Sequence, residues 1–282
     1  MTIRPLHFER RGKGPAVMLL HGFTGSGPSM SEVSHALARD FEVITPDLPG
    51  HGRSIAADDG RVYAFDDCLD RLAATLEYAG HARAHWIGYS MGARLALAFA
   101  VRFPRRVASL VLIGGRAGIE DASEREGRRR TDEALADRIE ADGIEAFVDE
   151  WLAQPLFASQ QRLGREFVAT QRRQRLANDA RSLAASLRGL GPGAQPPLFD
   201  NLPRLDVPVL LVAGALDRVF VAHAKDLERR LPDAEVREIA DAGHAVHVEQ
   251  PAAFIDVARD FMLRAGRSAR STDPLPVEET AS

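Results

Sequence analysis

Short apolar runs alternate along the chain with longer stretches of helical period. The runs have the length of strands, and an unbroken apolar run is typical of a strand buried on both faces of a parallel sheet. Residues 65–79 instead repeat their apolar positions with the period of a helix that packs one face on the core. We therefore expect an α/β fold in which helices flank a mostly parallel central sheet, with strands at residues 3–9, 16–20, 41–47, 84–87, 107–113, 207–213 and 235–239.

This alternation stops at about residue 116 and resumes at about residue 200. The stretch between is charged and helical in pattern, with helix-breaking residues near Gly143, Pro155, Gly164 and Gly189. It predicts a helical lid inserted into the sheet order. The expected organisation is a first core segment at 1–115, the lid at 116–199, a second core segment at 200–266 that closes with a helix at 251–265, and a disordered tail at 267–282.

The sequence Gly88-Tyr89-Ser90-Met91-Gly92 stands where an apolar run ends and an alanine-rich helical stretch begins. A strand that turns straight into a helix strains the backbone at the tip, and the two glycines remove side chains that would collide there. This order resembles the nucleophile elbow of the α/β-hydrolase fold, which makes Ser90 the candidate catalytic residue. In that fold two backbone N–H groups stabilise an oxyanion, and we expect them here to be those of Met91 and Phe23.

A serine hydroxyl needs a base to accept its proton and an acid to orient that base. Asp217 follows the run at 207–213, and His244 follows the run at 235–239. The chain order is then serine, acid, histidine, as in an α/β-hydrolase, so we predict these two residues as the partners of Ser90. The competing candidates for base or acid are His247, Asp241 and Asp206.

Three more polar residues follow the early strands, and we expect them to brace loops rather than to transfer protons. They are His21, Asp47 and His51. The loops that carry them lie at the carboxyl end of the predicted sheet, where α/β folds form their crevice.

Composition limits the classes of partner. The chain has 282 residues and a net charge of −4, and all but two of its 36 basic residues are arginine. The charge balance gives no reason to expect nucleic acid or an anionic membrane as a partner. Cys68 is the single cysteine, and neither a signal peptide nor a membrane-spanning run is visible, so we expect a cytoplasmic protein. We expect no metal and no organic cofactor, and the pattern does not specify an oligomeric state.

Two sets of strings carry a closer resemblance. Residues 20–26, 47–52, 88–94 and 242–244 look like the α/β-hydrolase superfamily at large. The chain is also similar to one family within it, the MenH enzymes, which are the 2-succinyl-6-hydroxy-2,4-cyclohexadiene-1-carboxylate synthases of the menaquinone pathway. The strings that carry this similarity lie in the predicted lid, at residues 128–132, 147–158 and 183–188, with Gln195 and Pro196 beyond them.

The resemblance implies a lyase that eliminates pyruvate from a small cyclohexene polycarboxylate. It implies the triad Ser90, Asp217 and His244, and it places substrate-binding roles on Tyr89, Arg94, Arg128, Trp151 and Arg175. Arginine suits such a substrate because its planar, permanently charged fork binds carboxylates in pairs of hydrogen bonds. Where the family has two glycines after the elbow serine, this chain has Gly92 and Ala93, and the added methyl should crowd the turn slightly.

Two other functions remain compatible with these residues. A serine carboxylesterase or a carbon–carbon bond hydrolase would use the same triad with Ser90 as a covalent nucleophile, and only the lid strings favour the lyase. A binding module of hydrolase fold is the second alternative. Such modules usually lack a member of the triad, whereas this chain has all three.

Overall fold

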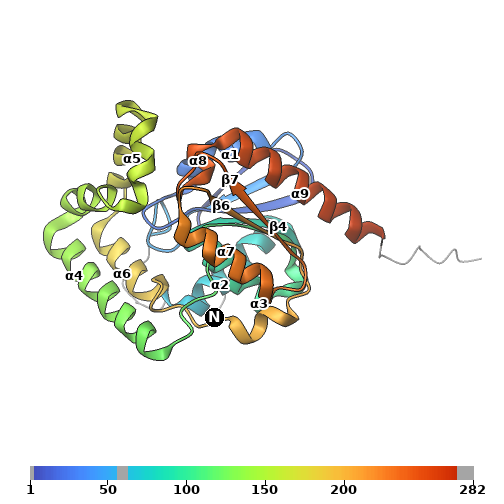
Figure 1. Ribbon diagram of the computed structural model, residues 1–282, viewed down its shortest axis with the longest axis horizontal. Helices are drawn as coiled ribbons and strands as arrows, with labels where there is room; N and C mark the ends of the chain where they lie inside the picture. The colour runs from blue at the N-terminus through green and yellow to red at the C-terminus, as the bar shows by residue number, and fades with distance from the viewer. Residues whose placement is uncertain (1–2, 56–62, 272–282) are drawn as a thin grey trace, which may run out of the picture.

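A mostly parallel sheet of seven strands runs through the centre of the molecule (Figure 1). The computed structural model describes residues 3–55 and 63–271. The strands lie in the order β1-β3-β2-β4-β5-β6-β7; β1 is antiparallel to β3, and the other neighbours are parallel. The expected α/β class is confirmed, with strands β1 (Phe8–Arg11), β2 (Ala16–Leu20), β3 (Glu42–Pro46), β4 (Ala84–Tyr89), β5 (Val107–Ile113), β6 (Val209–Gly214) and β7 (Ala234–Ile239).

Helices cover both faces of this sheet. One apolar cluster joins it to α2 (Phe65–Tyr78), α3 (Met91–Arg102) and α7 (Arg218–Arg230), and a second joins its other face to α1 (Ser31–Leu37) and α9 (Pro251–Ser271). Along β2 the side chains alternate between the clusters, with Met18 in the first and Val17 in the second. The unbroken apolar runs of the sequence therefore reflect strands that are buried on both sides. Short helices η1 (Gly27–Met30), η3 (Pro104–Arg106), η5 (Phe199–Arg204) and α8 (Val246–Glu249) complete the core.

A helical insertion interrupts the sheet order between β5 and β6, and Figure 1 shows it in green and yellow on one side of the sheet. It consists of α4 (Ala122–Leu152), η4 (Pro155–Leu163), α5 (Arg165–Leu176) and α6 (Ala180–Leu190). Gly143 kinks α4 with φ 81°, so the helix changes direction at one of the breaks that the sequence contains. Apolar side chains of α4 and α6, among them Ile139 and Leu183, form a third, separate cluster.

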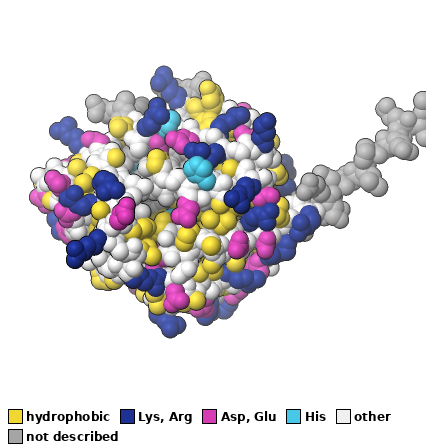
Figure 2. All heavy atoms as spheres, turned by 90° about the horizontal axis from the view of Figure 1, so that it is seen from above, with side chains coloured by type: hydrophobic (Ala, Val, Ile, Leu, Met, Phe, Trp, Pro, Cys, Tyr) yellow, Lys and Arg dark blue, Asp and Glu magenta, His cyan; other side chains and the backbone are white. Residues whose placement is uncertain are grey.

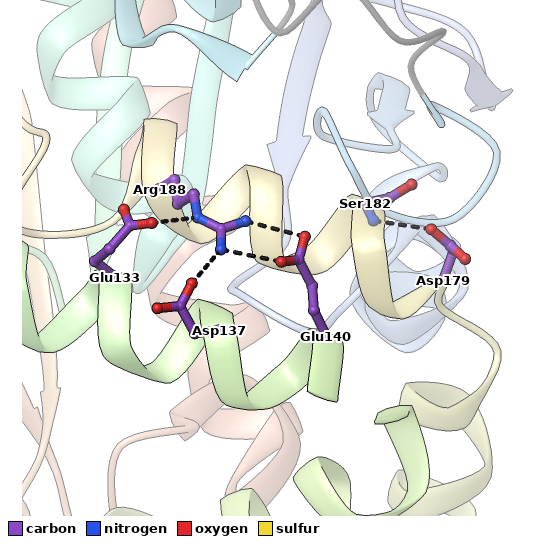
Figure 3. Close-up of polar contacts among 6 residues, drawn as sticks. All are labelled: Glu133, Asp137, Glu140, Asp179, Ser182 and Arg188. Carbon is purple, nitrogen blue, oxygen red and sulfur yellow. Dashed lines mark hydrogen bonds and ion pairs between the residues drawn. The ribbon is translucent and has the colours of Figure 1, made fainter. Parts of the chain in front are cut away.

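One arginine joins α4 and α6 at the surface of the insertion. Arg188 donates hydrogen bonds to Glu133, Asp137 and Glu140 over N···O distances between 2.6 and 3.1 Å (Figure 3). Each exposed pair contributes little by itself, but three carboxylates around one guanidinium form a network. The contacts hold the part of α4 before the Gly143 kink against α6, which forms one wall of the cavity described below.

Charge is mixed on the face that Figure 2 shows, where Lys and Arg side chains are interspersed with Asp and Glu. On that face the many arginines therefore do not form a continuous positively charged surface. None of the helices within the described ranges has the length and apolar character of a membrane span.

Two boundaries differ from those expected. The first strand was expected at residues 3–9 but spans Phe8–Arg11, because the Leu6 N–H donates to Thr75 Oγ1 at 2.9 Å instead of joining the sheet. Helix α9 continues through Ser271, beyond the expected end at residue 265, and no proline interrupts it in this stretch. The expected tail therefore overlaps this helix, and residues 272–282 lie outside the described residues.

Candidate active site

Ser90 occupies a sharp turn between β4 and α3. Its backbone has φ 52° and ψ −106°, a positive φ that residues other than glycine rarely adopt, and its N–H donates to the Ile113 carbonyl oxygen at 2.8 Å. A Cβ at Gly88 would lie 2.3 Å from the Gly92 carbonyl oxygen, and one at Gly92 would lie 2.5 Å from the Leu20 carbonyl oxygen. The turn therefore requires that both positions lack a side chain.

The methyl of Ala93, which was expected to crowd this turn, is accommodated by a glycine that follows β5. Ala93 is fully buried, and a Cβ built on Gly115 would lie 3.1 Å from the Ala93 Cβ. Glycine at position 115 leaves the space that the methyl occupies.

Gly92→Ala is expected to destabilise the protein by about 1–3 kcal/mol, because the new methyl would collide with backbone at the end of β2. Urea denaturation measures this change in the free energy of unfolding. Gly127→Ala is the matched control within α4, where the nearest atom to the new Cβ is Arg130 Nη2 at 3.8 Å. There alanine should raise stability by up to about 1 kcal/mol. Equal stability of Gly92→Ala and the wild type would contradict the packing of the elbow.

The structure brings Ser90, His244 and Asp217 together in a hydrogen-bonded chain. His244 Nε2 lies 3.0 Å from Ser90 Oγ, and His244 Nδ1 lies 2.9 Å from Asp217 Oδ2. His244 is 3% exposed, and its ring packs against the rings of Tyr89 and Phe220 at centroid distances of 5.3 and 4.4 Å. These contacts fix the plane of the imidazole, so one nitrogen faces the hydroxyl while the other faces the carboxylate.

Asp217 is held by the start of helix α7. It is the N-cap residue of that helix, and its Oδ1 accepts a hydrogen bond from the Phe220 N–H at 3.3 Å. One carboxylate oxygen thus satisfies the helix end, while the other faces His244. The carboxylate is positioned by secondary structure rather than by a flexible loop.

The loop that carries His244 is anchored by Glu249, a residue that sequence reasoning missed. The Glu249 side chain is fully buried and accepts hydrogen bonds from the N–H groups of Gly243 at 2.9 Å and Ala245 at 3.3 Å. It also pairs with Arg162 of the helical insertion at 3.2 Å. The residues on both sides of His244 are therefore tied to one carboxylate, and that carboxylate is tied to the insertion.

The competing acids and base lie elsewhere. Asp206 precedes β6 and is exposed, and Asp241 is exposed in the turn after β7. His247 is buried, with its ring tilted against that of Tyr89 at a centroid distance of 4.4 Å, but it does not line the cavity that contains Ser90. Burial, aided by the charges of His244 and Arg175, lowers the pKa of His247 to about 3.

A cavity of about 580 Å³ opens over Ser90 and His244, between the carboxyl end of the sheet and the helical insertion. Phe23 and Met91, which carry the expected oxyanion donors, both line it. Met91 is the first residue of α3, so its N–H has no partner within the helix and lies where the helix dipole is positive. The arrangement can stabilise negative charge that develops beside Ser90.

Within the described residues, four arginines line this cavity, namely Arg94, Arg116, Arg128 and Arg138, whereas Asp132 is the one carboxylate that lines it. Arg94 and Arg128, both expected, line it together with Trp151, and Arg116 also lines it although sequence reasoning did not single it out. Arg94 is 6% exposed and donates to the Leu190 carbonyl oxygen at 2.8 Å and to Gln195 Oε1 at 3.2 Å. Burial and the charge of Arg128 lower the pKa of Arg94 to about 9, which leaves it charged at neutral pH.

Tyr89 and Arg175, the other two residues expected to bind substrate, do not line this cavity. They face a separate pocket of about 20 Å³ together with His247. Arg175 Nη1 donates to the backbone and side-chain oxygens of Gln171, at 3.0 and 2.7 Å. Its guanidinium lies 5.7 Å from the centre of the Phe157 ring. In this arrangement the Arg175 side chain is held within the helical insertion.

His21, Asp47 and His51 form hydrogen bonds that connect the two glycine-rich loops. The Leu48 N–H donates to His21 Nε2 at 2.9 Å, and the Thr24 N–H donates to His51 Nε2 at 3.1 Å. Asp47 accepts from the Gly27 N–H at 2.7 Å. Because each Nε2 accepts, both histidines are neutral with the proton on Nδ1. The loop that contains Phe23 is thereby held in place.

Protonation of these buried histidines should weaken the fold below about pH 6.5. Burial and the neighbouring His21 lower the pKa of His51 to about 3, whereas an unfolded histidine titrates near 6.5. The stability that neutral His51 contributes is therefore complete above pH 6.5 and is lost as the pH falls toward 3. In His51→Gln the slope of unfolding free energy between pH 6 and 5 should decrease by about 1.4 kcal/mol per pH unit. Urea denaturation across this range measures the slope, and an unchanged slope would contradict the assignment.

The described residues contain no group of three or more His, Cys, Asp or Glu side chains placed to hold a metal ion.

Three comparisons with known proteins match this chain over most of its length. A family with the alpha/beta hydrolase fold matches residues 15–251. A Bacillus subtilis protein, provisionally named a 2-succinyl-6-hydroxy-2,4-cyclohexadiene-1-carboxylate synthase, is 40% identical over 247 residues, which cover 88% of this chain and 90% of that protein. An Escherichia coli protein of the same name is 34% identical over 86% of this chain and 91% of its own length. The solved structure of MenH from S. aureus superposes with a TM-score of 0.88 at 31% identity, covering 92% of this chain and 99% of that one.

Proposed function

The chain belongs to the α/β-hydrolase-fold family of 2-succinyl-6-hydroxy-2,4-cyclohexadiene-1-carboxylate synthases, and on that basis we propose that it eliminates pyruvate from 2-succinyl-5-enolpyruvyl-6-hydroxy-3-cyclohexene-1-carboxylate. It is then a carbon–oxygen lyase of menaquinone biosynthesis. The observation that carries the proposal is the chain from Ser90 to Asp217, which opens into a cavity lined by Arg94, Arg116 and Arg128. A single free cysteine, Cys68, accords with the cytoplasmic location that we also propose.

Overall, the reaction removes a proton from ring C2 and shifts electrons through the ring until a pair leaves with the oxygen on C5. The C2–H bond breaks, C2=C3 and C4=C5 double bonds replace the C3=C4 bond, and the bond from C5 to the enolpyruvyl oxygen breaks. The group leaves as the enolate of pyruvate and takes up one proton, which balances the proton removed from C2, so no water and no redox partner is consumed. The chemistry needs a base at C2 and stabilisation of the enolate that forms on the succinyl carbonyl.

We assign the base to the Ser90 oxygen. His244 Nε2, at 3.0 Å, accepts the hydroxyl proton, and Asp217 stabilises the charged imidazole from the other side. The N–H groups of Phe23 and Met91 are proposed to donate to the succinyl carbonyl oxygen as it becomes negative. In this assignment Ser90 forms no covalent bond to the substrate.

Carboxylate binding is assigned first to Arg94 and Arg128, which reach the cavity, with Trp151 beside them. Arg94 lies one helical turn after Ser90 on α3, so its charge lies close to the reacting end of the substrate. Tyr89 and Arg175 remain proposed substrate residues, and they require a shift of the Arg175 side chain out of the small pocket. A small polycarboxylate is the substrate class that this cavity suits.

Two assays on the same preparation test the proposal. Pyruvate release from the cyclohexene substrate is followed with a coupled dehydrogenase, and hydrolysis of a neutral p-nitrophenyl ester is followed in parallel. The lyase assignment predicts rapid pyruvate release and slow ester hydrolysis. Rapid ester turnover without pyruvate release would instead identify a carboxylesterase that uses Ser90 as a nucleophile, and activity in neither assay would favour a binding module.

A further inference from the structure

Arg116 presents uncommitted hydrogen-bond donors to the cavity. It follows Gly114 and Gly115 at the end of β5, and its Nε donates to the Gly118 carbonyl oxygen at 3.1 Å. Across residues 3–55 and 63–271, its two Nη groups have no hydrogen-bond partner, and no carboxylate lies within ion-pair distance of them. Arg128 differs, because its Nε is paired with Asp132 at 2.7 Å. A half-buried guanidinium with both Nη groups free is suited to receive a carboxylate from a ligand.

The surroundings of Arg116 favour an anion at this point of the cavity. Burial and the charge of Arg128 lower the pKa of Arg116, so the two cations repel each other across the cavity. His223 of α7 lines the cavity as well, and burial together with the charge of Arg116 lowers its pKa. The result is a cation beside a neutral imidazole, and a bound carboxylate would relieve the repulsion between the arginines.

Arg116 and His223 also mark an edge of the cavity. Both of them line an adjoining hollow of about 280 Å³, whereas Ser90 and Arg94 do not. Glu120, Asp121, Glu124 and Asp226 line that hollow with Arg116 and Arg230, and because Arg230 pairs with Glu120 and Asp226, the acids outnumber the cations there. Negative charge would be repelled there, so a carboxylate is favoured on the cavity side of Arg116.

The shape of the substrate indicates which of its carboxylates would bind to Arg116. The substrate carries three, on the ring, the succinyl group and the enolpyruvyl group. With ring C2 at Ser90, the leaving group on C5 is on the opposite side of the six-membered ring. Arg94 lies one helical turn from Ser90, while Arg116 stands at the cavity edge. The enolpyruvyl carboxylate is therefore the one that extends toward Arg116.

We propose that Arg116, with His223 beside it, binds the carboxylate of the enolpyruvyl group that leaves as pyruvate. This inference rests on the proposed function. Bound there, the carboxylate keeps the leaving group oriented while the C5–O bond breaks, and the same contact holds pyruvate before release. Arg116 thereby selects a substrate with an acidic leaving group.

Product inhibition tests this assignment, because pyruvate carries the former enolpyruvyl carboxylate whereas the cyclohexadiene product keeps the ring and succinyl carboxylates. In Arg116→Gln the KM for substrate and the inhibition constant for pyruvate should rise by roughly 10- to 100-fold. Inhibition by the cyclohexadiene product, which lacks the enolpyruvyl carboxylate, should stay unchanged. Arg116→Lys keeps the charge without the fork and should fall between the wild type and Arg116→Gln. His223→Gln should weaken pyruvate inhibition less than Arg116→Gln does.

Arg230→Gln is the matched control, because Arg230 lines only the adjoining hollow and should leave both inhibition constants unchanged. Unaltered pyruvate inhibition in Arg116→Gln, or equal weakening for both products, would overturn the assignment. Those results leave the proposed function standing as long as the wild type releases pyruvate. A wild-type protein that releases no pyruvate would overturn both.

Discussion

Replacing Ser90 with alanine is expected to lower kcat for pyruvate release by about 10³- to 10⁴-fold while the protein remains folded. The substitution removes the oxygen that lies 3.0 Å from His244 Nε2, and with it the proposed base. His244 and Asp217 keep their mutual contact, since their hydrogen bond does not depend on Ser90. Stopped-flow detection of pyruvate gives kcat, and thermal unfolding checks the fold.

Ser186→Ala is the control for this experiment. Ser186 is fully buried on α6, and its hydroxyl has no hydrogen-bond partner in the described part of the chain, so its loss should change neither kcat nor stability appreciably. A Ser90→Ala protein with wild-type pyruvate release would exclude Ser90 as the base. The reaction would then require another group in the cavity.

Loss of the Arg94 guanidinium is expected to have the second largest effect. Arg94→Met keeps the apolar stem but removes a buried charge that lines the cavity. Two charge-assisted hydrogen bonds to substrate are worth about 3–4 kcal/mol together, so kcat/KM should fall roughly 10²- to 10³-fold. The variant should also lose some stability, because the Leu190 carbonyl oxygen loses its donor.

The control for Arg94 lies on the same helix. Arg102 of α3 forms an ion pair with Asp70 at 2.7 Å and does not line the cavity, so Arg102→Met should keep kcat/KM. If Arg94→Met retained kcat/KM as well, the guanidinium would be a structural brace that holds α3 to the end of α6 and to Gln195 rather than a substrate ligand.

Local patterns in the sequence were sufficient for the sheet and for the elbow. Strands buried on both faces need unbroken apolar runs, and the turn at Ser90 needs glycine at positions 88 and 92 because backbone atoms lie within 2.5 Å of where their side chains would begin. The chain order of Ser90, Asp217 and His244 follows from the order of the strands. These features depend on neighbours in sequence, which is why they could be predicted.

Features that depend on side-chain direction could not be predicted in the same way. Arg116, which follows β5, lines the cavity, whereas Arg175 of α5 does not line it and donates to Gln171. Glu249 follows His244 by only a few residues, but its role depends on a buried turn that returns its carboxylate to the Gly243 N–H. Nothing in the residue types alone separates these outcomes.

The most direct test of the central claim is single-turnover pyruvate release from substrate deuterated at ring C2, with intact-mass analysis of the protein during the reaction. If the Ser90 oxygen removes the C2 proton, deuterium slows pyruvate release severalfold and the mass of the protein stays that of the free chain. Release at an unchanged rate, together with a covalent adduct on Ser90, would contradict the account and identify Ser90 as a nucleophile.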